Sequence, residues 1–214
     1  MNATLHYIYD PLCGWCYGAE PLAWAAAKVD GLTLQLHAGA LWPQPTRLPE
    51  GTRRYIQQAD QRIAQMSGQP FGAPYLNGLL LDPAMVLESR PVIAAVLAAQ
   101  SLDSAKALSM LKGIQHAHYE LGLHVVQEAT LLDIAAAIGL DRAAFTNALR
   151  SVPVDAHIDA SRVLMNHVGA QGFPTFVLEI NGEWIAVPHS RFAATPSQFG
   201  EWLDGQMRAH SRTH

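Results

Sequence analysis

The chain contains two cysteines, Cys13 and Cys16, and only a glycine and a tryptophan separate them. A cysteine pair at this spacing can cycle between a dithiol and a disulfide. The pair follows an extended segment at residues 4–9 and precedes a segment of helical composition at residues 17–29. At a helix N-terminus, unpaired N–H groups and the helix dipole stabilise the thiolate, which is the reactive form of cysteine. The pattern therefore predicts a redox site at this pair.

A structural zinc site is the alternative use of such a pair. Zinc needs two further Cys or His ligands at a matching spacing. The chain has no other cysteine, and the nearest histidines, His6 and His37, fall on predicted strands without a paired spacing. The sequence therefore favours redox chemistry and predicts no metal and no cofactor.

The composition is that of a globular protein with a large core. Half of the 214 residues are hydrophobic and 15% are charged, so the fold does not depend on disulfides. The net charge of −4 and the absence of a basic run give no reason to expect a nucleic-acid partner. The chain enters its first predicted strand without a signal-peptide pattern, and its apolar stretches are too short to span a membrane. We expect a cytoplasmic protein.

The elements that must position the cysteines lie at the two ends of the chain. Residues 4–9 and 32–37 are predicted strands on either side of the first helix. Near the other end, a helix precedes a strand that begins after Pro174. A turn signal at residues 181–182 joins it to a further strand, and a final helix begins near Pro196.

Between these ends, residues 50 to 150 have a helical pattern throughout. Gly68 predicts the end of the first of these helices. Asp82 followed by Pro83 predicts the start of another, and Pro91 predicts a break or kink within it.

Without the helical block, the predicted order is βαβ followed by αββα, which is the thioredoxin fold. We therefore predict an α/β protein in which residues 1–45 and 151–214 form a thioredoxin-like domain. Residues 46–150 form a helical domain, inserted between the second strand and the helix that precedes the proline-led strand. Alanine-lined helix faces could pack against a second copy, so a homodimer is also possible.

Two motifs resemble those of a known family. Residues 9–18, YDPLCGWCYG, and residues 172–176, GFPTF, are similar to the corresponding motifs of the DsbA family of thioredoxin-like oxidoreductases, within its FrnE-like branch. The resemblance covers the whole chain. It implies a thiol–disulfide oxidoreductase or isomerase that exchanges disulfides with protein or small-molecule thiols such as glutathione.

The resemblance also implies roles for individual residues. Cys13 would be the exposed nucleophile and Cys16 the buried resolving thiol, and the Phe173–Pro174 bond would be cis and face them. If Cys13 is the N-cap of the helix, the Cys16 N–H can point at its sulfur. The expected substrate-binding and supporting residues are Gly14, Trp15, Phe173, Pro174 and Thr175.

The chain departs from the family pattern near the cysteines. Tyr7 occupies the place where many thioredoxin relatives carry a buried acid. Asp10 is closer to the cysteines, but it is expected to be solvated at the end of its strand. Because Gly14 and Trp15 carry no charge, we expect a less stabilised thiolate and a less oxidising couple than in DsbA.

Two other functions remain open. Kappa-type glutathione transferases and glutathione-dependent chromene-carboxylate isomerases have a similar architecture but use a serine at the position of Cys13. The presence of both Cys13 and Cys16 argues against that branch. The third hypothesis is that the protein is a peptide-binding chaperone module in which the cysteines are incidental to the function.

Overall fold

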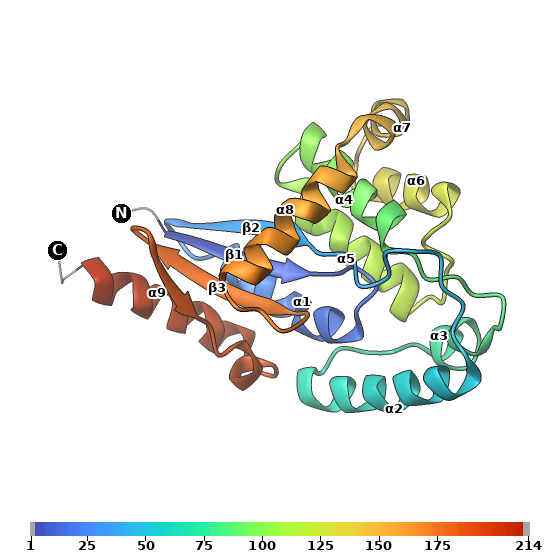
Figure 1. Ribbon diagram of the computed structural model, residues 1–214, viewed down its shortest axis with the longest axis horizontal. Helices are drawn as coiled ribbons and strands as arrows, with labels where there is room; N and C mark the ends of the chain where they lie inside the picture. The colour runs from blue at the N-terminus through green and yellow to red at the C-terminus, as the bar shows by residue number, and fades with distance from the viewer. Residues whose placement is uncertain (1–2, 212–214) are drawn as a thin grey trace.

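A four-stranded sheet forms the centre of the protein, for which a computed structural model describes residues 3–211 (Figure 1). The strand order is β2-β1-β3-β4. The central strand β1 (Ala3–Tyr9) pairs in parallel with β2 (Leu32–Ala38) and antiparallel with β3 (Thr175–Ile180). The edge strand β4 (Glu183–Ala186) pairs antiparallel with β3.

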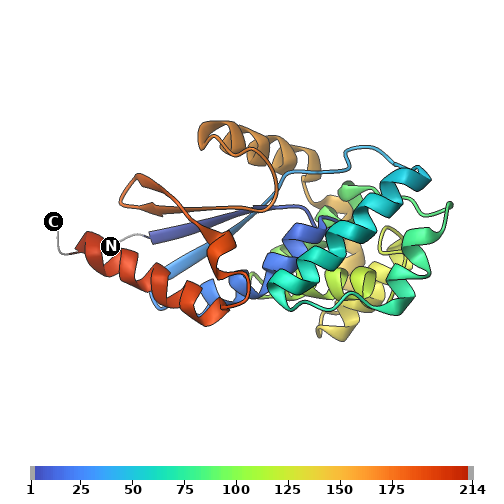
Figure 2. The same ribbon diagram turned by 90° about the horizontal axis from the view of Figure 1, so that it is seen from below.

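Helices cover both faces of this sheet (Figure 2). The parallel β1–β2 pair needs a crossover connection, which α1 (Gly14–Ala26) provides. Helix α1 packs with the C-terminal helix α9 (Pro196–Ser211) on one face, and α8 (Val154–His167) lies on the other. Because both of its faces are covered, β1 is buried along its whole length. A short 3-10 helix, η2 (His189–Phe192), leads from β4 into α9.

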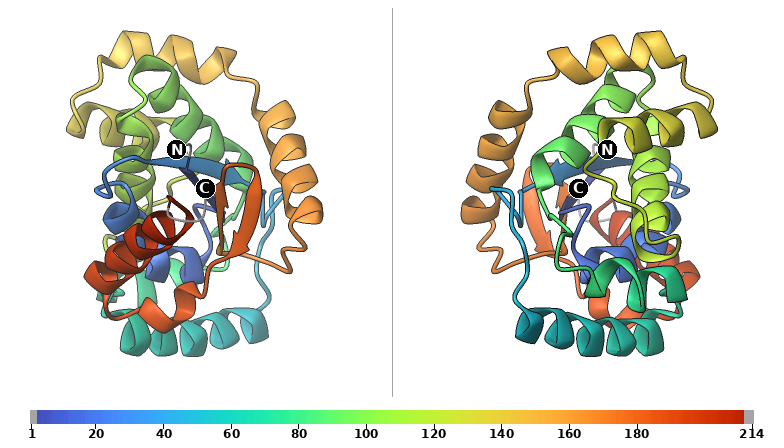
Figure 3. Two further views of the ribbon diagram at one scale, coloured as in Figure 1. Left: turned by 90° about the vertical axis from the view of Figure 1, so that its left-hand side faces the viewer. Right: turned by 90° about the vertical axis from the view of Figure 1, so that its right-hand side faces the viewer.

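The helices between β2 and α8 form two groups on different sides of α1 (Figure 3). The long helix α2 packs directly against α1, and the helices from α4 to α7 form a bundle that contacts α1 through α5. The bounds are α2 (Glu50–Ser67), α3 (Ala73–Leu76), η1 (Leu79–Leu81), α4 (Ser89–Leu102), α5 (Lys106–Tyr119), α6 (Glu128–Ala137) and α7 (Arg142–Ser151).

This arrangement confirms the predicted thioredoxin fold with a helical insertion. Gly68 ends α2 with a positive φ of 76°, as its position predicts. The division into residues 1–45 and 151–214 on one side and 46–150 on the other stays a prediction. Buried residues of both parts belong to one continuous hydrophobic cluster.

The predicted helix start at Asp82 is wrong. Asp82 and Pro83 form a turn in which the Asp82 carbonyl accepts the Met85 N–H, and α4 begins only at Ser89. The Ser89 N–H donates to the Trp42 carbonyl oxygen at 2.8 Å, so a contact with the loop after β2 fixes where α4 begins. Pro91 does not break this helix, because it lies in the first turn, where its missing N–H has no intrahelical acceptor to lose.

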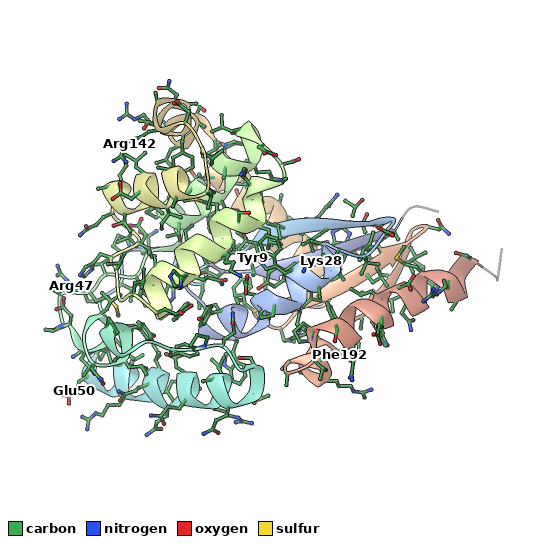
Figure 4. All side chains as sticks on the ribbon, turned by 180° about the vertical axis from the view of Figure 1, so that it is seen from behind. Tyr9, Lys28, Arg47, Glu50, Arg142 and Phe192 are labelled. Atoms are coloured by element: carbon green, nitrogen blue, oxygen red, sulfur yellow. The ribbon has the colours of Figure 1, made fainter. Side chains whose placement is uncertain are left out.

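The interior and the margin of the molecule differ sharply in polarity. Figure 4 shows Tyr9 in the interior, where the sheet meets the helical insertion, whereas Arg47, Glu50 and Arg142 lie at the outer margin. Within residues 3–211, no helix combines the length and the apolar character that crossing a membrane requires.

Acid should destabilise the protein through the buried histidine of α5. Burial lowers the pKa of His118 to about 4, against 6.5 for a free histidine, so the folded state resists its protonation. The stabilisation is present above pH 6.5 and is lost as the pH falls towards 4. Urea unfolding should show that, between pH 7.5 and pH 5, a His118→Gln variant loses about 2 kcal/mol less stability than the wild type.

The exposed His116 on the same helix provides the control for this prediction. A His116→Gln variant keeps the buried His118, so it should retain the loss of stability on acidification that His118→Gln reduces. An equal loss in the His118→Gln variant would show that His118 is not the group responsible.

Candidate redox site

The cysteine pair lies where β1 passes into α1. Cys13 is the N-cap of α1 with extended backbone angles (φ −100°, ψ 117°), and both cysteines are free thiols. Cys16 lies in the first turn and is 0% exposed. Cys13 is only 6% exposed, so the expectation of an exposed first thiol needs correction. A cavity that Cys13 lines reaches the thiol from one side.

The Cys13 thiol points across the fold to the proline loop. Its Sγ lies 3.8 Å from the carbonyl oxygen of Phe173, within reach of a weak S–H hydrogen bond. The expected hydrogen bond from the Cys16 N–H to this sulfur is not formed. Within the described residues, the side chain of the N-cap Cys13 accepts no capping hydrogen bond. In the dithiol form, the sulfur is therefore turned towards the proline loop.

Cys16 is held in a fully buried environment. Burial raises the pKa of its thiol well above the usual value, and the neighbouring Cys13 raises it further. The hydroxyl of Tyr7, which stands where relatives carry an acid, donates to the Cys16 carbonyl oxygen at 3.1 Å. The ring of Tyr7 stacks on Phe176 of β3 at 4.3 Å between centroids, so the tyrosine ties the first turn of α1 to the sheet.

Asp10 is fully buried, which overturns the expectation that it is solvated. Its carboxylate accepts the Leu12 N–H and the Leu41 N–H, both at 2.8 Å, and the hydroxyl of Ser89. Burial raises the pKa of Asp10, and these three donors lower it. One carboxylate thus joins the cysteine loop to the loop after β2 and to the start of α4. No sequence pattern near Asp10 predicts that Leu41 and Ser89, which are distant in the chain, donate hydrogen bonds to it.

The proline loop faces the cysteines, and its Phe173–Pro174 bond is cis. Thr175, the first residue of β3, donates its hydroxyl to the Gly172 carbonyl oxygen at 2.8 Å and so closes the loop. The Phe173 ring fits against Gly39, where an added Cβ would lie 2.5 Å from the ring atom Cζ. A glycine at the end of β2 is therefore needed for this ring to approach the sheet.

Trp15 separates two cavities of about 330 Å³ each. Its side chain is 40% exposed, and its expected contact with substrate stays a prediction. On one side lies a cavity bounded by Pro174, Phe173 and residues of η2, and on the other a cavity that contains Cys13. Mostly apolar and aromatic side chains line the Cys13 cavity, among them those of Leu12, Trp42, Leu48, Ile56, Tyr75 and Leu80.

Helix α2 approaches α1 at two glycines. An added Cβ at Gly14 would lie 2.6 Å from Oδ1 of Asp60, and one at Gly18 would lie 2.6 Å from Cγ2 of Ile63. Two glycines one helical turn apart thus let α2 pack directly beside the cysteine motif. Gly14 is expected to be a supporting residue, and in the structure its lack of a side chain leaves room for Asp60 of α2.

Asp60 is the site residue that the sequence interpretation missed. It is 2% exposed, and the Tyr75 hydroxyl donates to its Oδ2 at 2.8 Å. Burial raises its pKa to about 7. The available signal was its position between Ile56 and Ile63 on the apolar face of α2, where a carboxyl group is unusual.

Within residues 3–211, no group of three or more His, Cys, Asp or Glu side chains is placed to hold a metal ion. The cysteine pair thus has two thiols, a facing proline loop and an adjacent apolar cavity as its chemical surroundings.

The fold and the cysteine pair agree with a known family. Residues 4–198 match the DSBA-like thioredoxin domain. The chain belongs to this family. As a DSBA-like protein with both cysteines of the motif, it is a thiol–disulfide oxidoreductase, and thiols and disulfides are its substrates.

A solved structure resembles this DSBA-like protein over nearly the whole of both chains. The cytosolic disulfide reductase DsbM from Pseudomonas aeruginosa is 45% identical, with a TM-score of 0.88 over 96% of this chain and 99% of the DsbM chain. A second DsbM structure, with GSH, is 43% identical over the same shares, with a TM-score of 0.86.

More distant structures share the fold alone. A candidate protein disulfide isomerase from Nitrosomonas europaea is 23% identical, with a TM-score of 0.82 over 98% of this chain and all of the other. A 2-hydroxychromene-2-carboxylate isomerase is 16% identical, with a TM-score of 0.58 over 96% of this chain and 98% of the other. The search of curated proteins gave no match for this DSBA-like chain.

Proposed function

We propose that this protein is a cytosolic disulfide reductase that acts on glutathione disulfide and on mixed disulfides of glutathione. Cys13 is the nucleophile and Cys16 the resolving thiol. The observation that carries the proposal is the placement of Cys13 at the wall of a cavity of about 330 Å³, with its sulfur 3.8 Å from the Phe173 carbonyl oxygen. The likeness to a cytosolic disulfide reductase, also solved with GSH, supports the direction and the substrate.

The reaction has two exchange steps. The Cys13 thiolate attacks one sulfur of the substrate disulfide, forms a mixed disulfide and releases the first substrate thiolate. Cys16, as its thiolate, then attacks the Cys13 sulfur, forms the Cys13–Cys16 disulfide and releases the second. The substrate gains two electrons and two protons in total, and the enzyme loses them. An external thiol must return the enzyme to its dithiol form.

The surroundings of Cys13 favour small substrates over folded proteins. A thiol that is 6% exposed can be reached only by a disulfide that enters the cavity which Cys13 lines or that lies against the proline loop. A disulfide held within a large folded surface cannot approach it closely. The Phe173 backbone beside the cis-proline supplies polar groups for an extended, peptide-like molecule such as glutathione.

The redox equilibrium of the cysteine pair tests this function. The protein is equilibrated in graded glutathione buffers, the free thiols are trapped, and the mass is measured. We expect one reversible two-electron transition at or below the cytosolic glutathione poise, about −220 to −260 mV by extraction methods. A transition near the DsbA value, about −120 mV, would instead mark an oxidase and contradict the proposal.

Two further predictions concern the assembly. The homodimer suggested by the alanine-lined helices stays a prediction, and sedimentation of the reduced protein tests it. The domain boundaries also stay predictions, and limited proteolysis would locate an accessible linker if residues 46–150 form a separate unit.

A further inference from the structure

A carboxyl group from the inserted helix α2 lies beside the redox motif. Oδ1 of Asp60 occupies the space next to Gly14, only 2.6 Å from where a Cβ would be, and Gly14 directly follows Cys13. Asp60 and Cys13 line the same cavity. Because Asp60 is 2% exposed, little water screens its charge from the thiol.

The surroundings of Asp60 supply one hydrogen bond and no opposite charge. Tyr75 of α3 donates to Oδ2, and among the described residues no ion pair engages this carboxylate. The two exchange steps at Cys13 and Cys16 do not use the Asp60 carboxyl group. Ionising a buried carboxyl group without a nearby cation costs free energy. The presence of Asp60 at this position therefore suggests a role beyond packing.

Among the buried carboxyl, histidine and tyrosine side chains that line this cavity, Asp60 is the one that changes its charge near neutral pH. Tyr75 and Tyr119 stay neutral, because burial raises the pKa of each hydroxyl above its usual value. His118 also stays neutral, because burial lowers its pKa to about 4. Asp60 has a pKa of about 7. Asp10 is fully buried and does not line this cavity, and its three donors stay in place in an Asp60 variant.

We propose that the Asp60 carboxylate keeps the Cys13–Cys16 couple reducing, because it places a negative charge beside the thiolate that forms at Cys13. The inference rests on the proposed reductase function and assigns its electron direction to a residue outside the cysteine motif. Asp60 acts through Cys13 and is therefore a positioning residue.

The direction in which Asp60 shifts the redox equilibrium depends on which redox form carries a charge. A negative carboxylate destabilises a nearby thiolate, whereas the disulfide form has no charge to repel. The dithiol form therefore rises in free energy relative to the disulfide, and the protein gives up electrons more readily. DsbA is a strong oxidant for the opposite reason, because its reduced form is stabilised.

Glutathione equilibria of the wild type and an Asp60→Asn variant, at about pH 6 and about pH 8, test the proposal. At the higher pH, the constant for oxidation of the variant should be at least about threefold smaller, because a neutral amide no longer opposes the thiolate. At the lower pH the difference should shrink, since the wild-type carboxyl group is then protonated.

Two further variants separate this charge effect from a packing effect. Tyr75→Phe removes the donor that stabilises the carboxylate, so it should shift the equilibrium in the same direction as Asp60→Asn but by less. Asp159→Asn, on the exposed side of α8, should leave the equilibrium unchanged.

The outcomes are distinct. A reversible couple with equal constants in the wild type, Asp60→Asn and Tyr75→Phe at both pH values overturns the role of Asp60 and leaves the reductase intact. A shift of the same size at both pH values also overturns it, because a charge effect requires an ionised carboxyl group. The absence of any reversible couple in the wild type would overturn both proposals. If Asp60→Asn does not fold, Tyr75→Phe still decides.

Discussion

Replacing Cys13 with serine should lower the rate of glutathione disulfide reduction by roughly 10³-fold or more, because a serine hydroxyl is a poor nucleophile at neutral pH. Replacing Cys16 with serine should instead stop the reaction after its first step. The variant should then accumulate a mixed disulfide between Cys13 and glutathione, since Cys16 is the buried thiol beside it. Mass spectrometry of each variant after exposure to glutathione disulfide measures both effects.

The two variants are matched, since each removes one sulfur from the same motif and leaves the rest of the site intact. Glutathione bound covalently to Cys16 in the Cys13→Ser variant would reverse the assigned roles. Full turnover in Cys16→Ser would favour a glutathione transferase or isomerase. The chaperone hypothesis would be favoured if the double serine variant still held unfolded proteins and the wild type had no reductase activity.

Replacing Asp10 with alanine should lower the free energy of unfolding by about 3–5 kcal/mol. The substitution leaves three donors around a fully buried position without an acceptor, namely the N–H groups of Leu12 and Leu41 and the hydroxyl of Ser89. Each such group costs roughly 1–3 kcal/mol when it is left unpaired, and some relaxation offsets the sum. Urea unfolding of the reduced protein measures the loss. Because the same bonds hold the cysteine loop, the reductase rate should fall as well.

Asp82 offers a close control for Asp10. Both precede a proline, and both accept the N–H of the residue two positions ahead at 2.8 Å. Asp82 lies in a partly exposed turn, so water can replace its carboxylate, and Asp82→Ala should cost less than about 1 kcal/mol. Equal losses in the two variants would show that the local turn, rather than the links to Leu41 and Ser89, gives Asp10 its importance.

The cysteine motif, its helix and the neighbouring strand could be predicted because each is encoded locally. Cys13 lies at the start of α1 because an extended apolar segment ends and a helix-forming segment begins there. The turn at residues 181–182 and the end of α2 at Gly68 follow from backbone preferences of single residues. In each case, the information lies within a few residues of the feature.

The start of α4 could not be predicted in the same way. Asp82 and Pro83 have the local signature of a helix start, but the Trp42 carbonyl oxygen binds the Ser89 N–H and sets the actual start at Ser89. A contact between segments far apart in the chain outweighed a local preference of about 1 kcal/mol.

The sequence by itself determined the chemistry of this protein, because two thiols at one helix N-terminus and a proline-led strand suffice for a redox site. The tertiary structure alone decided the electrostatic surroundings of those thiols. Asp10 is buried because the loop after β2 and the start of α4 close over it, and Asp60 lies beside Gly14 because α2 packs on two glycines of α1. Burial and distance fix such charges, and both depend on how distant segments pack.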